Sequence, residues 1–450
     1  MRPDAIVVGG GISGLAAAVD LSSHGFAVTL YEQREKLGGR AYSYRDKQTG
    51  DIVDNGQHLL MGCFQNTKTF LHTIGSYQKL VTQNNLHVTF YHPKRGFVNF
   101  RCPNLPAPFH VIAGLLRLKT LSWKDRFQLL QVLWNVAKDS GRSLTADRMT
   151  VEEWLKSCNQ SVESRKFFWN IIATATLNQK PEVASASLFI KVLKETFLRS
   201  KRDSVLMIPR VGLSKLYVED ACEFIRKHRG NVKAGLGVSR ILFSGDRAVA
   251  VEQRTGDHIE ASTVISAIPL LDLVATIPDG SLVPIDVEKD LDSLSHSPIL
   301  TVNLWLDRPI MDTDFVSLVD SPIQWIFNKN KIFSNGTAKG SYLSCLVSGA
   351  DELLTFEKDQ LVSLALDEIG KAYPKARDAK LIHSLVLKEK RATLPSSRGA
   401  QKFRLPPKTK WKNFFLAGDW TDTGLPATIE SAVTSGYTAA KLAHEYLVRN

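Results

Sequence analysis

The sequence predicts an α/β protein: a parallel sheet packed between helices, with an inserted α+β segment. The pattern strand, helix, strand opens the chain, the middle changes to helical spacing, and the last segment, 413–447, returns to a strand, a loop and a helix. The chain has 450 residues, and domains commonly have roughly 100 to 200 residues, so two or three folding units are expected.

The first elements have the pattern of a βαβ unit. A continuous apolar run at Ala5–Val8 predicts a strand, the Ala- and Leu-rich stretch Ile12–His24 predicts a helix, and Phe26–Tyr31 predicts a second strand. Strands this apolar must be covered on both faces. They therefore predict a parallel sheet with helices on each side.

The later elements follow the same spacing rules. Apolar residues three and four apart predict helices at Leu115–Lys119, Trp123–Ala137, Val183–Leu198 and Lys358–Ala372. Strands are predicted at Arg247–Gln253, Thr263–Ala267, Leu300–Trp305 and Tyr342–Val347.

These elements divide the chain into two discontinuous domains. Segments 1–75, 205–290 and 392–450 are assigned to the domain of the predicted parallel sheet. Segments 76–204 and 291–391 are assigned to a substrate-binding domain made of a helical cap and a mixed sheet.

Composition narrows the class of protein. Hydrophobic residues make up 44% and charged residues 23%, which excludes a disordered chain, collagen and a coiled-coil rod. The five cysteines are odd in number and form no CxxC, so neither a disulfide framework nor a zinc site is expected and a reducing compartment fits best. Only three residues precede the first apolar run Ala5–Val8, and the uncharged stretch Cys102–Leu116 contains three prolines. We therefore expect no secretion signal and no membrane-spanning helix.

The clearest motif is a GxGxxG pattern between the first strand and the first helix. Gly9 permits the tight turn, Gly11 lets the backbone approach a pyrophosphate, and Gly14 allows close packing of the helix, whose N-terminus binds the phosphates. Glu32 ends the second strand, where a carboxylate binds a ribose diol. The pattern predicts a dinucleotide site, and Arg34 leaves a 2′-phosphate open as an alternative.

Two further motifs bear on which dinucleotide binds. Leu37-Gly38-Gly39-Arg40 places a second glycine turn and a cation after the acidic residue, either for a second approach to the pyrophosphate or as a simple loop. The stretch 414–419 is a strand ending in Gly-Asp, and Pro426–Glu430 is predicted to open a long helix. Asp419 is positioned to bind a polyol or to cap a turn, and the helix N-terminus to stabilise negative charge on a reduced flavin.

Together these three motifs resemble the FAD-dependent amine oxidase and phytoene desaturase superfamily. The likeness is narrower at 54–58, 105–110, 177–178, 184–185, 207–214 and 417–430, which are similar to the hydroxysqualene dehydroxylases, squalene-associated FAD enzymes of bacterial hopanoid synthesis. The resemblance covers nearly the whole chain. It implies a Rossmann-like FAD/NAD(P)-binding domain of the glutathione-reductase/amine-oxidase type with an inserted α+β substrate domain.

The resemblance also implies the cofactor, the reaction and the site. The cofactor is FAD, and reduced FAD delivers hydride to 12-hydroxysqualene as its hydroxyl leaves, giving squalene. The FAD-binding residues are expected to be Gly9, Gly11, Ile12, Ser13, Gly14, Glu32, Gln33, Gly38, Gly39, Arg40, Gly56, Gln57, His58, Val238, Gly418, Asp419, Pro426, Ala427, Thr428 and Ile429.

An allylic alcohol loses hydroxide poorly, so the site needs an acid near the oxygen, an apolar tunnel and a flavin within hydride reach. His58 is the candidate acid or polariser because protonation of an imidazole is accessible near neutral pH, and Asp54 is the candidate to orient it. The alternative is that both residues only hold the flavin or a loop.

The basic charge of the chain is concentrated in one segment. Lys and Arg number 57 and Asp and Glu 45, a net charge of +12. Segment 91–142 contains nine basic and two acidic residues, 9 − 2 = +7. Eight apolar residues lie among these cations: Leu115, Leu116, Leu118, Leu121, Trp123, Phe127, Leu130 and Trp134. An anionic membrane surface is therefore an expected partner, with peripheral association at the inner face of the bacterial cytoplasmic membrane. The alternative is an amphipathic helix that covers only its own core.

The FAD motifs are also compatible with other enzymatic functions. A carotenoid-type desaturase or amine oxidase would use oxidised FAD, and the source of electrons for a reductive enzyme is open between a separate reductase and free reduced nicotinamide. No RNP, helix-turn-helix or zinc signature supports nucleic-acid binding. There is no HExxH and no close histidine pair, so no metal site is expected, and no Gly-x-Ser-x-Gly favours a hydrolase.

Overall fold

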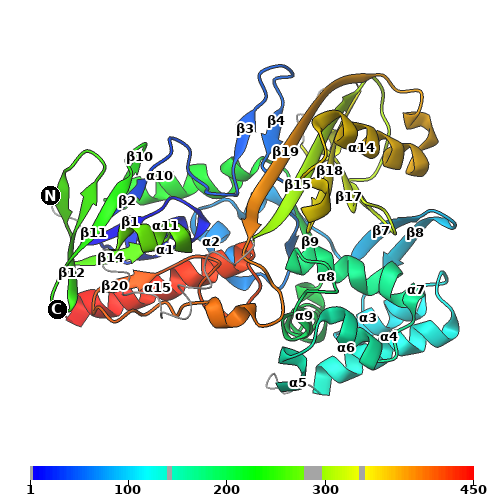
Figure 1. Ribbon diagram of the computed structural model, residues 1–450, viewed down its shortest axis with the longest axis horizontal. Coiled ribbons are helices and arrows are strands. Elements are labelled where there is room, and N and C mark those ends of the chain that lie inside the picture. Colours follow the sequence, from blue (N-terminus) through cyan, green and yellow to red (C-terminus); the bar gives the residue numbers. More distant parts are fainter. Residues whose placement is uncertain (1–3, 139–143, 278–295, 334–339, 450) are drawn as a thin grey trace.

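A computed structural model describes residues 4–138, 144–277, 296–333 and 340–449. One sheet has five strands in the order β10-β2-β1-β14-β20, and its neighbouring strands all run parallel. They are β1 (Ala5–Val8), β2 (Val28–Glu32), β10 (Asn231–Ala234), β14 (Thr263–Ser266) and β20 (Phe414–Leu416). This sheet brings strands from the N-terminal part of the chain, which carries the glycine motifs, together with β20 near the C-terminus, which precedes the Gly-Asp motif. Figure 1 shows the two termini at the same end of the molecule.

The two faces of this sheet are covered differently. Ala5 and Val7 of β1 pack in a cluster with α1 (Ile12–Ser23), α10 (Glu219–Lys227) and α15 (Ile429–Arg449). Ile6 and Val8 point to the other face, since successive strand residues alternate. There they meet α11 and the antiparallel strands β11, β12 and β13, which are Leu270–Thr276, Val238–Ser244, Arg247–Gln253 and His258–Glu260. Helices therefore cover both faces, as predicted: α1, α10 and α15 lie on one face, and α11 lies on the other together with a second, antiparallel sheet.

A seven-stranded sheet forms the upper right of the molecule in Figure 1, in the order β19-β15-β18-β17-β16-β7-β8. Its strands are β19 (Leu381–Thr393), β15 (Ser297–Leu306), β18 (Ser341–Ser348), β17 (Trp325–Asn328), β16 (Phe315–Leu318), β7 (His87–His92) and β8 (Gly96–Arg101). The helix α14 (Lys358–Ala372) covers one face of it through a shared apolar core. A small sheet, β5-β9-β6, consists of Leu60–Met61, Leu206–Pro209 and Leu80–Thr82. It pairs strands from both predicted domains, whose boundaries remain a prediction.

The segment between 109 and 198 is largely helical and forms a lobe beside the seven-stranded sheet (Figure 1). It contains α3 (Phe109–Leu116), α4 (Trp123–Lys138), α5 (Leu144–Asp147), α6 (Val151–Ser157), α7 (Val162–Ser164), α8 (Asn170–Leu177) and α9 (Ala186–Leu193). A π-helical turn, Lys194–Leu198, continues α9. The predicted helix at 183 begins at Ala186 instead, because the Ser185 hydroxyl accepts a hydrogen bond from the Leu188 amide and caps the first turn.

Most predicted elements are confirmed and a few end elsewhere. Strand Arg247–Gln253 and helix Lys358–Ala372 have their predicted bounds. The second strand begins at Val28 because Phe26 still belongs to the turn after α1, where its amide donates to the Leu21 carbonyl. The predicted helix over 115–119 is wrong beyond Leu116, where α3 ends.

The start of α15 also differs from the prediction. The helix begins at Ile429, three residues after Pro426. The Thr428 hydroxyl accepts a hydrogen bond from the Ser431 amide at 3.2 Å, which is the arrangement of an N-cap. Pro426 and Ala427 therefore lie in the loop before the helix.

Only part of the basic segment 91–142 is exposed on the protein surface. Of its apolar residues, Leu115, Leu118 and Leu121 are buried in the protein's own core, so the expectation that they enter an interface is wrong. Arg126 is buried as well, with its guanidinium donating to the carbonyls of Leu121 and Leu116. Arg142 and Asp139, which the charge count included, lie outside the described residues. Within the described ranges, no helix is both long and apolar enough to cross a bilayer.

Candidate active site

The first glycine motif forms an open cradle at the end of β1. Gly9 has φ +108°, and a methyl group on Gly14 would lie 1.9 Å from the Gly9 carbonyl oxygen, so α1 packs against the turn only because residue 14 is glycine. A methyl group on Gly11 would meet only the Gly39 Cα, at 3.9 Å. No side chain caps the first turn of α1. Open space above Gly11 and uncapped helix amides suit a phosphate group.

The second glycine turn lies directly beside the first. The Gly38 amide donates to the Gly10 carbonyl at 2.8 Å, and Gly38 and Gly39 both have positive φ, +105° and +61°. The two turns thus form one wall of the same groove, as a second approach to a pyrophosphate requires. Glu32 is fixed at the end of this wall, because its carboxylate accepts from the amides of Gly10 and Arg34 at 2.7 and 2.9 Å.

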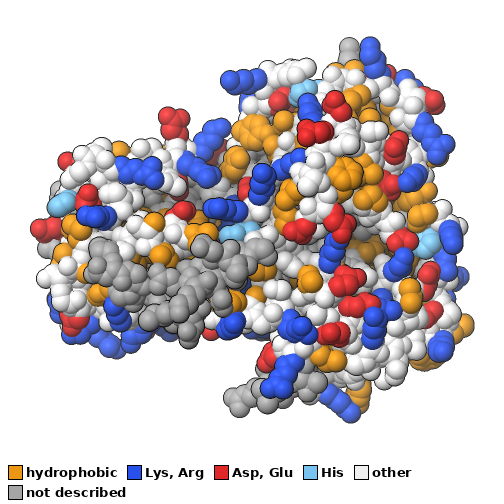
Figure 2. Space-filling view, in the orientation of Figure 1, with side chains coloured by type: hydrophobic (Ala, Val, Ile, Leu, Met, Phe, Trp, Pro, Cys, Tyr) orange, Lys and Arg blue, Asp and Glu red, His pale blue; other side chains and the backbone are white. Residues whose placement is uncertain are grey.

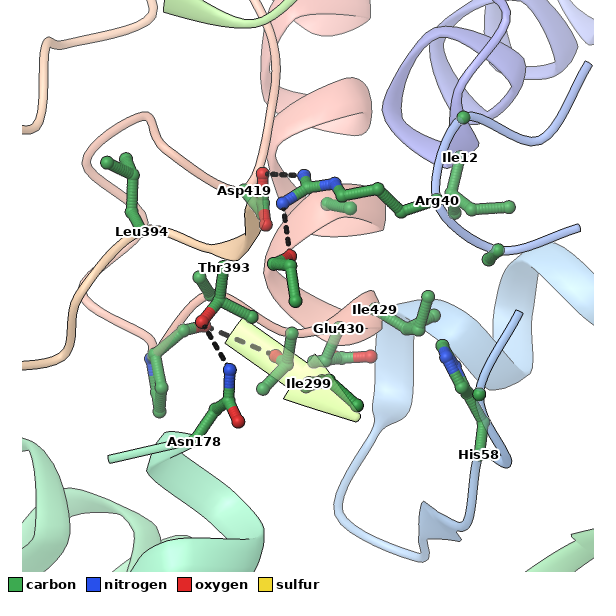
Figure 3. A pocket seen from close by; sticks show the side chains of 18 of the residues that line it. Ile12, Arg40, His58, Asn178, Ile299, Thr393, Leu394, Asp419, Ile429 and Glu430 are labelled. Atoms are coloured by element: carbon green, nitrogen blue, oxygen red, sulfur yellow. Dashed lines mark hydrogen bonds and ion pairs between the residues drawn. The ribbon is translucent and has the colours of Figure 1, made fainter. Parts of the chain in front are cut away.

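Arg40 and Asp419 meet from opposite ends of the chain (Figure 3). Nη2 of Arg40 lies 2.6 Å from Oδ1 of Asp419, and Nη1 donates to the Ala392 carbonyl at 2.6 Å. The Asp419 carboxylate raises the pKa of Arg40, so the guanidinium stays charged next to the two glycine turns. A cation at this place can balance the charge of a diphosphate.

His58 faces the cavity without a hydrogen-bond partner that the described part of the chain supplies (Figure 3). Burial lowers the pKa of its imidazole, and the nearby Asp54 carboxylate raises it to a smaller extent. The neutral form is therefore favoured near pH 7, contrary to the expectation of an easily protonated acid. A neutral imidazole can still hold a substrate hydroxyl through a hydrogen bond.

Within the described structure, Asp54 does not bond to His58, the residue that it was expected to orient. Its carboxylate accepts from the Ser43 hydroxyl, the Leu213 amide and the Lys329 ammonium, at 2.7, 3.0 and 2.8 Å. No described hydrogen bond joins Asp54 to His58, and Asp54 is not among the residues that line the cavity. Asp54 thus anchors segment 54–58 to the protein interior.

Sequence reasoning missed Lys329. Its side chain is only 2% exposed, pairs with Asp54 and also donates to Oε1 of Gln57. Lys329 follows β17, far from segment 54–58 in the sequence, and no motif surrounds it. The only signal was a pair of lysines, Lys329 and Lys331, directly after an apolar strand, and lysines are usually exposed.

Asn178 ties the helical lobe to the seven-stranded sheet. It has φ +50° at the end of α8, and its amide nitrogen donates to the Ser297 carbonyl and the Thr393 hydroxyl at 3.1 and 2.9 Å (Figure 3). Its carbonyl oxygen accepts from the Gly349 amide at 3.0 Å. These bonds fix the end of α8 beside the cavity.

One cavity of about 1530 Å³ is lined by the glycine turns, Glu32, Arg40, Asp419, His58 and Asn178. Every residue predicted to bind FAD lines it except Gly14, whose place is in the packing of α1. The part away from the glycine turns is apolar and is lined by Leu86, Val88, Phe90, Phe100, Phe168, Ile171, Ile172, Val192, Phe197 and Leu206. Single-ligand pockets are commonly about 300 to 1,000 Å³, so this volume suits a cofactor together with a second, apolar ligand.

Comparison with known proteins identifies the family. Residues 12–444 match the family described as flavin containing amine oxidoreductase. The chain belongs to this family. It is an FAD-dependent oxidoreductase, and the groove between the glycine turns, Arg40 and Asp419 fits the cofactor.

Individual relatives narrow the likeness. A hydroxysqualene dehydroxylase of Zymomonas mobilis is 29% identical over 97% of this chain and 98% of its own length. A 15-cis-phytoene desaturase of Synechococcus elongatus is 23% identical, with 97% and 94% covered. The solved structure of an oxidoreductase from Methanosarcina mazei has a TM-score of 0.74 at 17% identity, with 98% and 100% covered, and shares the fold. The family fold predicted from the sequence is thus confirmed.

Proposed function

We propose that this flavoenzyme reductively removes the hydroxyl group of 12-hydroxysqualene, giving squalene for hopanoid synthesis. The supporting observation is an apolar chamber continuous with the FAD groove, in a chain that is similar over nearly its whole length to hydroxysqualene dehydroxylases. A C30 hydrocarbon chain requires such a chamber, because burying it away from water is the main driving force for its binding.

The proposed reaction converts R–OH, one hydride and one proton into R–H and water. Reduced FAD, when bound, supplies the hydride. The residues of this chain hold the substrate and keep bulk water away from the carbon that loses oxygen. His58 is the cavity-lining group proposed to hold the hydroxyl, and its imidazole, after taking up a proton from solvent, supplies the proton that completes the water.

His58→Ala tests this role. We expect the variant to keep its FAD, because the phosphate groove and Arg40 are unchanged, and to lose turnover by about a hundredfold, the common size of an acid–base or polarising contribution. Flavin content and squalene formation are measured on the same sample. Full FAD loading with unchanged turnover would remove His58 from the mechanism.

The reaction itself is tested by anaerobic mixing. Reduced holoenzyme mixed with 12-hydroxysqualene is expected to regain the spectrum of oxidised flavin and to form one squalene per flavin. The 23% identity with a phytoene desaturase makes a desaturase the second candidate. That enzyme would run in the opposite direction: oxidised protein would be reduced by a polyene, and the reduced protein would not react with the alcohol.

Two partners belong to this proposal. One is an anionic membrane surface, the inner face of the bacterial cytoplasmic membrane, where the enzyme associates peripherally and meets a substrate that dissolves in lipid. The other is a reductant for the flavin, either a separate reductase or free reduced nicotinamide.

A further inference from the structure

The helix α4 exposes an aromatic stripe. Trp123, Phe127 and Trp134 are 63%, 62% and 61% exposed, and the half-buried Leu130 lies between them. With 3.6 residues per turn, positions 123, 127, 130 and 134 fall within a sector of about 60°. Large exposed aromatic side chains aligned in this way mark an interaction surface.

This stripe is not the side of α4 that builds the protein core. The buried apolar residues of the helix are Leu129, Val132, Leu133 and Val136, which point to a different sector and pack with the rest of the lobe. The helix therefore carries two apolar faces: one is buried in the lobe, and on the other only Leu130 packs against the core while the three aromatic side chains stay exposed.

Exposed cations lie within α4 and in the segment that precedes it. Arg117, Lys119, Lys124 and Lys138 are all exposed. The ammonium group of Lys138 lies 4.8 Å from the ring centroid of Trp134. The only acid of the described residues 91–138 is Asp125, whose carboxylate already accepts from the Ser122 hydroxyl at 2.6 Å. Exposed aromatic side chains with Lys and Arg nearby suit an anionic bilayer, because the rings enter the headgroup region and the cations pair with lipid phosphates.

The helix that carries the stripe packs on elements of the cavity wall. Helix α4 packs on α9 and on the π-helical turn Lys194–Leu198, which supply Val192 and Phe197 to the apolar cavity wall. In Figure 1, α4 lies at the lower right of the lobe, on the far side of the molecule from the parallel sheet, and Figure 2 shows orange side chains at that rim. A partner bound at the stripe would therefore contact the lobe that forms the apolar end of the cavity, and not the domain that holds the FAD groove.

We propose that α4 lies flat on an anionic bilayer, with Trp123, Phe127 and Trp134 in the headgroup region and the flanking lysines on the lipid phosphates. The choice of a bilayer rests in part on the proposed function, since a C30 substrate is held in lipid. The docking surface is thus one helix face of segment 91–142 and not the whole segment.

Vesicle flotation without substrate tests the surface. Wild-type holoenzyme at low salt is expected to float with vesicles of phosphatidylcholine and phosphatidylglycerol, and weakly with phosphatidylcholine alone. The triple variant Trp123→Ala/Phe127→Ala/Trp134→Ala should bind on the order of a hundredfold more weakly. Lys119→Gln/Lys124→Gln should lose roughly fivefold for each cation removed, on anionic vesicles only.

Matched controls use exposed residues elsewhere. Phe356→Ala/Ile382→Ser/Val448→Ser removes three exposed apolar side chains, and Lys358→Gln/Lys375→Gln removes two cations, and both should float like wild type. Failure of the wild-type protein to float, or equal loss in the controls, would overturn the proposal. So would light scattering that shows a wild-type dimer turned monomeric by the triple variant, which would assign the stripe to a second copy. Turnover of detergent-dispersed 12-hydroxysqualene, measured separately, shows whether the proposed function fails instead.

Discussion

Gly11→Val is expected to give a folded protein that has lost its flavin. Gly11 has φ −71° and ψ 177°, which valine adopts readily, and its Cβ would enter open space, so the fold should persist. The side chain would stand where the diphosphate approaches the backbone, and FAD affinity should fall by about a hundredfold or more. Visible flavin absorption of the purified protein is the measurement.

Thermal unfolding separates loss of binding from loss of fold. FAD at a hundred times its Kd stabilises the wild type by about 2.7 kcal/mol. At the same concentration a site that binds a hundredfold more weakly gains only about 0.4 kcal/mol, so FAD should raise the melting temperature of Gly11→Val much less than that of the wild type. The contrasting variant is Gly14→Ala, which should destabilise even the apoprotein by about 1 to 3 kcal/mol, because its methyl group meets the Gly9 carbonyl. A Gly11→Val protein that keeps normal flavin content would contradict the placement of the phosphates.

Lys329→Met is expected to destabilise the protein by about 3 to 5 kcal/mol. The substitution removes the ammonium group and leaves the buried Asp54 carboxylate with only the Ser43 and Leu213 donors. Segment 54–58 should then loosen, so FAD is expected to bind less tightly as well. Denaturant unfolding of the apoprotein measures the loss of stability without the contribution of FAD.

The double variant Asp54→Asn/Lys329→Met is the control for this pair. If the cost arises from an unpaired buried charge, the double variant should recover about 1 to 3 kcal/mol relative to the sum of the two single variants. Additive effects would show that the two side chains act independently. A matched exposed pair, Lys227 with Glu223, should show a coupling below about 1 kcal/mol.

Local patterns predicted much of the fold. The run Ala5–Val8, the glycine spacing from Gly9 to Gly14 and the amphipathic stretch Lys358–Ala372 each specify a structure through contacts between near neighbours in sequence. Predictions failed where a distant partner decides. Leu115, Leu118 and Leu121 have the composition of a lipid-facing stretch, yet other parts of the lobe bury them. The burial that lowers the pKa of His58 likewise depends on elements the sequence does not place beside it.

The sequence by itself determined the first glycine turn, because a side chain at residue 14 would meet the carbonyl of Gly9, only five residues away. The resemblance of its motifs also identified the FAD family, which the comparison confirms. Only the tertiary structure joined Arg40 to Asp419, buried Lys329 against Asp54 and left one face of α4 uncovered. These features depend on which distant surfaces meet when the chain closes, and the free energy of such contacts arises from burial and charge pairing that no local spacing records.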